Sequence, residues 1–234
     1  MSIRVLIVDD NNLFRKGMAA LISASGEFEV AGDLGSGKEA VQACQTLEPD
    51  IVLTDIVLSG TNGLDTLVQI KRRRPQVKVV LLTDVRTEEF VRAALRAGTD
   101  GYVLKDASLE ELLMSLRSVA MGKKYLSPDV SNHVVDSFLH PETRNGKASH
   151  LEILTNRERS ILQLIAEGRT NRGAAEFLSV SPKTVEKHRS SLMHKLGLRN
   201  AAELTLVAME LGLIARPLSV GRFATNQGPQ DCPA

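Results

Sequence analysis

Short apolar runs alternate with amphipathic stretches through the first half of the chain. Five runs have the composition and length of β-strands, and each is followed by a stretch with helical periodicity: 3–8, 29–33, 51–55, 78–83 and 101–105. This alternation is typical of a parallel sheet covered by helices. We therefore predict a doubly wound α/β domain with five parallel strands over residues 1–124.

The pattern becomes purely helical after residue 125. Residues 127–139 are predicted to form one helix, and residues 140–150 are a polar stretch, so 125–150 is predicted to be a helix and flexible linker. Residues 151–216 contain four short helical patterns and no strand. We predict an all-α domain there and a disordered tail over 217–234.

Hydroxyl side chains mark the expected helix starts. The spacing of a capping box, a hydroxyl residue followed three positions later by glutamate, occurs at Ser36 with Glu39, Ser108 with Glu111, and Thr155 with Glu158. Further helices are predicted to begin near Thr170 and at Ser181, where Pro182 occupies a first-turn position that tolerates proline. The last helical pattern, 201–214, places four apolar residues on one face: Leu204, Val207, Ala208 and Leu211.

Composition narrows the class of protein. The chain is 43% hydrophobic, and no run approaches the roughly 20 apolar residues of a membrane span. We expect a cytoplasmic protein without a membrane partner. The two cysteines, Cys44 and Cys232, provide neither a disulfide framework nor a metal quartet.

Charge is uneven along the chain although the net charge is only +1. Residues 181–199 carry five lysines and arginines against a single glutamate, Glu186, before His188 and His194 are considered. A local basic face of this kind indicates either a nucleic-acid site or a solvated charged surface.

Chemically distinctive residues follow four of the predicted strands. Asp9 and Asp10 end the first strand, Asp55 the third, Thr83 the fourth and Lys105 the fifth. With the strand order 2-1-3-4-5 of the flavodoxin-like arrangement, the first and third strands are neighbours, and ligands bind beyond their carboxyl ends. The three carboxylates would then converge and repel one another unless a cation joined them.

Magnesium and phosphoryl chemistry fit this cluster. Mg²⁺ takes one or two carboxylates together with water and phosphate oxygens. An aspartate can also accept a phosphoryl group as an acyl phosphate, and Asp55 is our candidate. Lys105 and Thr83 could then meet the charge on the phosphoryl oxygens.

These residues, in VDDNNLFRKG, LTDIVLSGTNG, LLTD and GYVLKD, resemble the receiver domain of response regulators over about the first 120 positions. The resemblance implies phosphorylation of Asp55 by a sensor histidine kinase or a small phosphodonor. It further implies that Asp10, Asp55 and the Val57 backbone carbonyl bind Mg²⁺ with support from Asp9. Thr83 and Tyr102 would act as the switch pair; otherwise Tyr102 is a half-buried strand aromatic.

The sequence departs from the receiver pattern at three positions. The family usually has Met-Pro where this chain has Leu58 and Ser59, and a small residue where it has Asp84. Asp84 either adds negative charge beside the pocket, slowing phosphoryl entry or competing for metal, or points to solvent.

A phosphate-binding loop is the main rival interpretation of the first domain. Gly32, Gly37 and Lys38 nearly fit its spacing, but Glu39 stands where a hydroxyl residue should hold Mg²⁺. Glu39 also has a structural explanation as a capping residue, and a nucleotide site would leave Asp9, Asp10 and Lys105 without roles.

The basic face belongs to a predicted helix-turn-helix, TNRGAAEFLSVSPKTVEKHRSSLMHKLG. LTNRE, EGRTN, VSPKTVEKH and KLGL resemble the LuxR-type effector domain over about 60 residues. The resemblance implies base contacts from Glu186, Lys187 and Ser190, and phosphate contacts from Thr170, Asn171, Lys183, Thr184, His188, Arg189 and Lys195. At Gly173 and Ala174 the family prefers Glu and Ile, so we expect reduced stability in this domain.

Together the two resemblances identify a response regulator of the NarL/FixJ type, a non-enzyme that accepts and slowly loses a phosphoryl group. Phosphorylation is expected to shift a form in which the recognition helix is masked or the chain is monomeric toward a DNA-bound homodimer. The apolar face of 201–214 is more often core than a partner surface, but in so small a bundle it can be both, and its residues are the candidates for the dimer contact: Leu204, Val207, Ala208 and Leu211. Double-stranded DNA, a histidine kinase and RNA polymerase are the implied partners. A phosphorylation-independent or protein-interaction regulator is the alternative.

Overall fold

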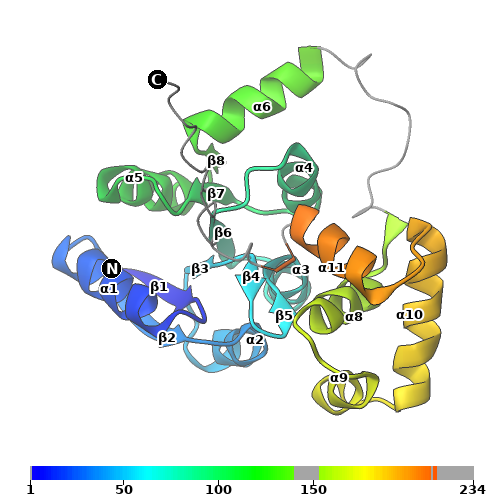
Figure 1. Ribbon diagram of the computed structural model, residues 1–234. Coiled ribbons are helices and arrows are strands. Elements are labelled where there is room, and N and C mark those ends of the chain that lie inside the picture. The colour runs from blue at the N-terminus through cyan, green and yellow to red at the C-terminus, as the bar shows by residue number, and fades with distance from the viewer. Residues whose placement is uncertain (1, 140–152, 212, 215–234) are drawn as a thin grey trace, which may run out of the picture.

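The computed structural model describes residues 2–139, 153–211 and 213–214 (Figure 1). The predicted linker, 140–150, and the predicted tail, 217–234, lie outside these residues. None of the described helices combines the length and the apolar character that a membrane crossing requires.

A parallel sheet forms the centre of the first domain. Its strand order is β2-β1-β3-β6-β7-β8, which contains the predicted 2-1-3-4-5 order. The strands are β1 (Ile3–Val8), β2 (Phe28–Leu34), β3 (Ile51–Thr54), β6 (Lys78–Thr83), β7 (Gly101–Leu104) and β8 (Tyr125–Leu126). The prediction of five strands was one short because β8 has two residues, too few to show a period along the sequence.

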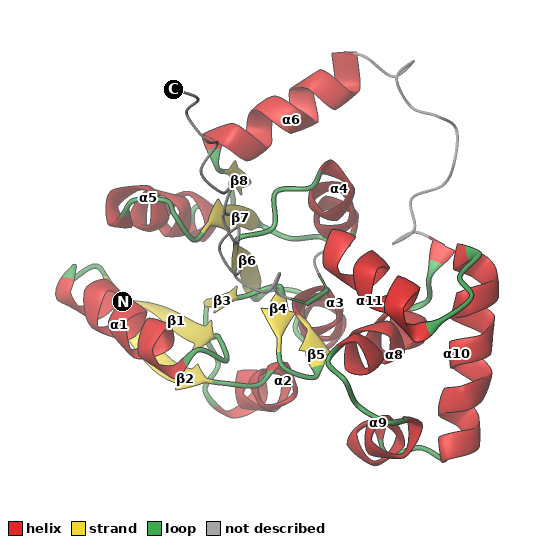
Figure 2. Cartoon of the chain, viewed as in Figure 1, coloured by secondary structure: helices red, strands yellow, loops and turns green. Residues whose placement is uncertain are grey.

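Five helices cover the two faces of this sheet (Figure 2). They are α1 (Asn12–Ala24), α2 (Gly37–Thr46), α3 (Gly63–Arg73), α4 (Glu88–Arg96) and α5 (Leu109–Ala120). Apolar residues of α1 and α5 pack on one face, and those of α2, α3 and α4 pack on the other. Alternate strand residues supply the two cores: Leu6 and Val8 face one side, whereas Val5 and Ile7 face the other.

A short antiparallel hairpin between β3 and α3 was not predicted. It pairs β4 (Val57–Leu58) with β5 (Thr61–Asn62) and turns at Gly60, whose φ of +75° favours glycine. After the hairpin, the backbone passes close to the end of β3. A Cβ added at Gly63 would lie only 2.1 Å from the Asp55 backbone oxygen, so this position requires glycine. We call residues 57–62 the pocket hairpin.

The second domain is all-α as predicted. After α6 (Pro128–Leu139) come α8 (Asn156–Ala166), α9 (Asn171–Leu178), α10 (Pro182–Leu196) and α11 (Ala201–Glu210). Helices α9 and α10 are joined by a short turn in which Ser179 has a φ of 53°. Thr170 and Ser181 cap α9 and α10 with their side chains, and Pro182 lies in the first turn of α10.

The predicted capping boxes have three different outcomes. Thr155 and Glu158 form the complete reciprocal box. Ser108 accepts a hydrogen bond from the Glu111 N–H, but the Glu111 carboxylate accepts one from Ser127 instead of closing the box. Ser36 makes no side-chain capping bond, so the prediction there was wrong. The spacing in the sequence predicts where the helices start, but it does not predict which donor the glutamate carboxylate will bind.

The two domains are in direct contact through α8. This helix packs against β5, and one continuous cluster of buried apolar residues extends from α2, α3 and α4 into the C-terminal helices. Figure 1 shows α8 on the side toward the sheet domain and α10 on the outer side.

Candidate functional site

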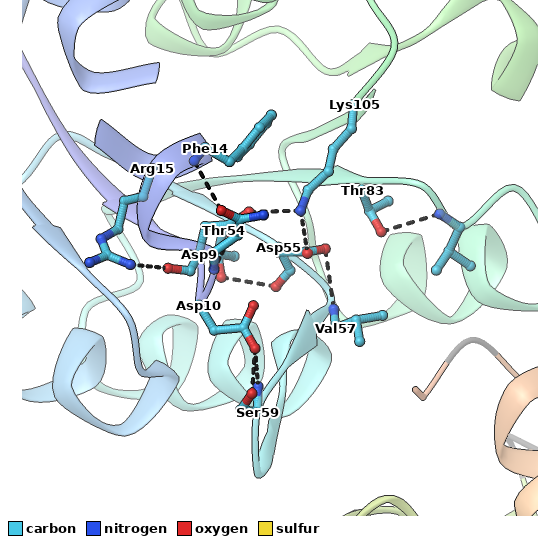
Figure 3. A network of polar contacts seen from close by, with 12 residues as sticks. Asp9, Asp10, Phe14, Arg15, Thr54, Asp55, Val57, Ser59, Thr83 and Lys105 are labelled. Carbon is cyan, nitrogen blue, oxygen red and sulfur yellow. Dashed lines mark hydrogen bonds and ion pairs between the residues drawn. The ribbon is translucent and has the colours of Figure 1, made fainter. Parts of the chain in front are cut away.

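Three strand ends bring together an ion triad at the carboxyl edge of the sheet. The Lys105 ammonium lies 2.7 Å from an oxygen of Asp9 and 2.6 Å from an oxygen of Asp55 (Figure 3). Both carboxylates are buried, with relative exposures of 3% and 7%. The Lys105 ammonium also lies 4.7 Å from the centre of the Phe14 ring, a favourable cation–π distance. The predicted convergence of β1, β3 and β7 on one site is therefore present.

Burial and charge compete in this triad. Burial raises the pKa of Asp55, although Lys105 and a hydrogen bond from the Val57 N–H oppose the rise. Burial alone would lower the pKa of Lys105, but the carboxylates of Asp55 and Asp9 outweigh it and raise that pKa. The lysine therefore remains charged, and it is the main compensation for two acids placed close together.

Asp10 lines the same cavity as Asp55 and Lys105 and is bound by Ser59 of the pocket hairpin. One of its oxygens accepts a hydrogen bond of 2.9 Å from the Ser59 backbone N–H and another from the Ser59 hydroxyl. Among the described residues no three His, Cys, Asp or Glu side chains form a group able to hold a metal ion. Lys105 lies between Asp9 and Asp55, and the gathering of all three acids around one cation stays a prediction.

A smaller set of oxygen donors nevertheless suits a hard cation. Asp10, Asp55 and Val57 line one cavity, and two carboxylates with a backbone carbonyl are the ligand types that Mg²⁺ takes while keeping several waters. The chemistry of these residues therefore fits a divalent ion.

Thr83 and Tyr102 are both connected to the backbone of Val85. The Thr83 hydroxyl accepts a hydrogen bond from the Val85 N–H at 3.2 Å, and the Tyr102 hydroxyl donates to the Val85 carbonyl at 2.7 Å. Both side chains are fully buried. The alternative of a half-buried Tyr102 is wrong, and burial together with the Asp55 charge raises the pKa of its hydroxyl.

A cavity of about 690 Å³ opens above the triad. The sheet domain contributes Asp10, Asn11, Asp55, Val57, Thr83, Asp84, Val85, Arg86, Thr87 and Lys105, and the C-terminal domain contributes Met209, Glu210 and Ile214. Asp84 is exposed and lines this cavity, so its negative charge faces the approach to Asp55. The cavity is therefore bounded by both domains.

The predicted DNA-reading side chains lie on an open surface of α10. Lys183, Glu186, Lys187 and Ser190 are exposed, while Val185 points into the core. Other predicted contacts are partly engaged within the domain. Arg189 donates to Asn171 at 3.2 Å, the Thr184 and Ser181 hydroxyls lie 2.8 Å apart, and Thr170 caps α9.

Lys195 has a structural role that the sequence did not indicate. Its ammonium lies 2.7 Å from the buried Glu158 carboxylate, which also accepts hydrogen bonds from Ser191 and Thr155. Burial alone would raise the pKa of Glu158, but these donors lower it to about 2. Lys195 is thus tied to the α8 cap, whereas His188 is half-buried on α10.

The candidate dimer residues of α11 belong mostly to the domain's own core. Leu204, Ala208 and Leu211 are buried, and Val207 is half-buried, because this face of α11 packs on α8. This packing agrees with the interpretation of the face as core, and a dimer contact at these residues stays a prediction. Leu206, which is 60% exposed, is a large apolar side chain that α11 presents to solvent.

Sequence reasoning missed the contacts between the domains. Gln163 donates to the Leu58 carbonyl at 2.6 Å, Glu167 accepts from the Gly60 N–H at 3.0 Å, and Ser160 donates to Asp65 at 3.1 Å. Asp65 also lies 3.6 Å from Arg159, and burial raises the pKa of Asp65 in spite of this partner. No sequence motif marks such residues.

The rival phosphate loop is not formed. Gly32 lies inside β2, and a Cβ at Gly37 would meet the Thr66 hydroxyl at 2.1 Å, so this stretch packs against the protein instead of cradling a ligand. Gly37 allows the close packing of α2 on α3, and Gly32 allows the close approach of Leu47 to β2.

Two families match the two domains. Residues 5–117 match the response regulator receiver domain, and residues 152–208 match the bacterial regulatory proteins of the luxR family. The chain is 34% identical over 215 residues to the response regulator protein VraR of Staphylococcus aureus, covering 92% of this chain and all of VraR.

Solved structures have the same arrangement of elements. A LuxR-family two-component response regulator from Aurantimonas matches 59% of this chain and 99% of its own, with 25% identity and a TM-score of 0.57. RcsB from Salmonella typhimurium matches 90% of this chain and 98% of its own, with 22% identity and a TM-score of 0.66. The chain therefore belongs to the two-component response regulators that join a receiver domain to a luxR-type DNA-binding domain and regulate transcription.

Proposed function

We propose that Asp55 is the residue of this response regulator that accepts the phosphoryl group. The observation that carries the proposal is the Asp55 carboxylate, which lies 2.6 Å from the Lys105 ammonium and lines a cavity of about 690 Å³. A carboxylate oxygen attacks phosphorus, the phosphoryl–donor bond breaks, and the donor leaves with its electron pair. Lys105 stands where it can then pair with a phosphoryl oxygen.

Asp10, Asp55 and the Val57 carbonyl would hold Mg²⁺, with Asp9 in support. When bound, this ion neutralises negative charge on phosphoryl oxygens. The oxygen-only donor set on one wall of the cavity supports the assignment. Asp9 already accepts a hydrogen bond from the Asn11 N–H and forms an ion pair with Lys105, which suits a supporting role.

Thr83 and Tyr102 would report the phosphorylated state. Both bond to Val85 in this structure, so a Thr83 hydroxyl drawn toward a phosphoryl oxygen must release the Val85 N–H. The adjoining segment from Val85 to Thr87 lines the same cavity as Met209 and Glu210 of α11. A change at the pocket is thus adjacent to the DNA-binding domain.

On duplex DNA, Glu186, Lys187 and Ser190 would contact base edges. The exposure of Glu186, Lys187 and Ser190 on α10 supports this assignment. Phosphate contacts would come from Thr170, Asn171, Lys183, Thr184, His188, Arg189 and Lys195, the last only if it leaves Glu158.

Control of DNA binding would act through dimerisation. Four of the α10 side chains are already exposed, which argues against masking of the recognition helix and favours a chain that is monomeric until phosphorylated. A sensor histidine kinase or a small acyl phosphate would be the donor, and RNA polymerase is a further partner. The chain would act in the cytoplasm, with domains 1–124 and 151–216 as the working units.

The test compares duplex binding by the full chain with and without acetyl phosphate and Mg²⁺, on a sequence selected from a random duplex pool. We expect tighter binding and a dimer after treatment of the wild type and of Glu39→Ala, a control at an exposed carboxylate of α2. Asp55→Ala should show neither. Equal affinity for Asp55→Ala and phosphorylated wild type would reject the proposal, and binding insensitive to salt would favour a protein-interaction regulator.

A further inference from the structure

The pocket hairpin lies between the acidic pocket and the DNA-binding domain, and it makes polar contacts on both sides. On the pocket side, the Val57 N–H donates to Asp55 at 3.2 Å. Two residues later, the Ser59 N–H and hydroxyl both donate to the same oxygen of Asp10. The hairpin therefore holds two of the acids that line the cavity.

The intervening residues of the hairpin contact the other domain. The Leu58 carbonyl accepts a hydrogen bond of 2.6 Å from Gln163, and the Gly60 N–H donates to Glu167 at 3.0 Å. Gln163 is fully buried, and its amide nitrogen also donates to the Glu167 carboxylate at 2.8 Å, so the two α8 residues that contact the hairpin are bonded to each other. The Phe177 ring also packs on Gly60 so closely that a Cβ there would lie 2.4 Å from it.

Successive residues of the hairpin alternate in direction, and this explains how one segment contacts both the acidic pocket and the DNA-binding domain. Val57 and Ser59 face the pocket, whereas Leu58 and Gly60 use their backbone groups toward α8. A movement of Ser59 relative to Asp10 must therefore shift the peptides that bind Gln163 and Glu167.

Ser59 controls which oxygen of Asp10 remains available. Its two donors occupy one carboxylate oxygen, and Figure 3 shows the other oxygen of Asp10 directed toward Asp55. A hydrogen bond to one oxygen of a metal-binding carboxylate fixes its orientation and strengthens metal binding. Proline at this position could not donate its backbone nitrogen.

We propose that Ser59 positions Asp10 for a divalent cation, and that the pocket hairpin thereby couples cation binding to the docked DNA-binding domain. The inference rests on the proposed cation site. Docking holds the hairpin where Ser59 can reach Asp10, so the docked chain binds the cation more tightly than the undocked chain. Reciprocally, the cation strengthens docking by the same factor.

The first experiment measures the affinity of the full chain for Mn²⁺, without phosphodonor, from the free-ion signal in electron paramagnetic resonance. Ser59→Ala removes one donor and should weaken binding roughly threefold to tenfold, and Ser59→Pro removes both and should weaken it roughly tenfold or more. Ser23→Ala, at an exposed serine of α1, should have no effect. Far-UV circular dichroism checks that each variant is folded.

The second experiment tests the coupling from the other domain. Glu167→Ala and Gln163→Ala alter contacts to the hairpin without touching the pocket, and we expect each to weaken Mn²⁺ binding roughly twofold to fivefold. Glu176→Ala on the exposed side of α9 is the control. In the wild type, Mg²⁺ should slow amide hydrogen exchange in residues 57–62 and in α8.

The outcomes separate this inference from the proposed function. Absence of Mn²⁺ binding by the wild type overturns both. Wild-type binding with unchanged or tighter affinity in the two Ser59 variants overturns the positioning role and leaves the cation site intact. Weaker binding in those variants, with no effect of Glu167→Ala or Gln163→Ala, overturns the coupling.

Discussion

The acidic pocket and the DNA-reading face of α10 differ in how their charges are held. In the pocket, the Lys105 ammonium is shared by two buried carboxylates within 2.7 Å. On α10, Lys183 and Lys187 project into solvent. The charged groups of the pocket are held in place by one another, whereas these two lysines of α10 have no such constraint from the part of the chain that the structure describes.

This difference sets the size of the effect expected from a single substitution. Removing one partner of a buried pair leaves a charge without compensation in a medium of low polarity. Removing one exposed lysine from a nucleic-acid face deletes one contact among several. The pocket should therefore be sensitive in stability, and the reading face sensitive in binding only.

Lys105→Ala should have the largest effect. It leaves Asp9 and Asp55 with like charges and no ammonium, and we expect a loss of about 3–5 kcal/mol from the unfolding free energy at pH 7. Because the pKa of Asp55 is already raised by burial, losing Lys105 raises it further. The protonated acid is favoured in the folded state, so the deficit should shrink as the pH falls through the folded pKa of Asp55.

Urea unfolding followed by circular dichroism at several pH values measures this effect. Lys123→Ala, at an exposed lysine of the same domain, serves as the control and should change stability little. This expectation would be contradicted if Lys105→Ala lost little unfolding free energy at pH 7, or if the loss grew as the pH was lowered. Either result would mean that Lys105 does not stabilise the buried charges of Asp9 and Asp55.

Lys187→Ala and Lys183→Ala should have intermediate effects, in DNA binding only. We expect Lys187→Ala to cost about 1–3 kcal/mol on the selected duplex and to relax base preference, since this residue is assigned to a base edge. Lys183→Ala should weaken all duplexes alike and reduce the slope of log affinity against log salt by about one. Fluorescence anisotropy over a salt series measures both; identical behaviour of the two variants would contradict the division of roles.

The same contrast explains what the sequence could predict. Asp9, Asp55 and Lys105 follow separate strands, and parallel topology brings strand ends together, so the triad was predictable from strand order. The five-helix cover and the helix-turn-helix followed from periodicity and caps.

The contacts that the sequence did not predict depend on how the folded helices and strands pack against one another. The pairing of Glu158 with Lys195, and of Gln163 with the Leu58 carbonyl, joins residues 37 and 105 positions apart with no local pattern to announce them. The apolar stripe of α11 was visible, but the sequence alone did not decide whether it faces α8 or a second chain. Two-residue strands such as β8 and the pocket hairpin fall below the length at which a period can be recognised.

Gly173→Ala should give the smallest effect and the opposite sign. Gly173 lies within α9, where an added Cβ would make ordinary contacts with the Thr170 hydroxyl at 3.5 Å and the Arg169 Cβ at 4.0 Å. Alanine should therefore stabilise the domain by about 0.5–1 kcal/mol through its higher helix propensity. Gly168→Ala is the matched control: its φ of +84° disfavours alanine, so the domain should lose stability. Thermal unfolding measures both, and a destabilised Gly173→Ala would show that α9 requires glycine. If instead α9 is stabilised while DNA affinity is unchanged, the reading face depends on its exposed side chains and not on the marginal stability of the helix beneath it.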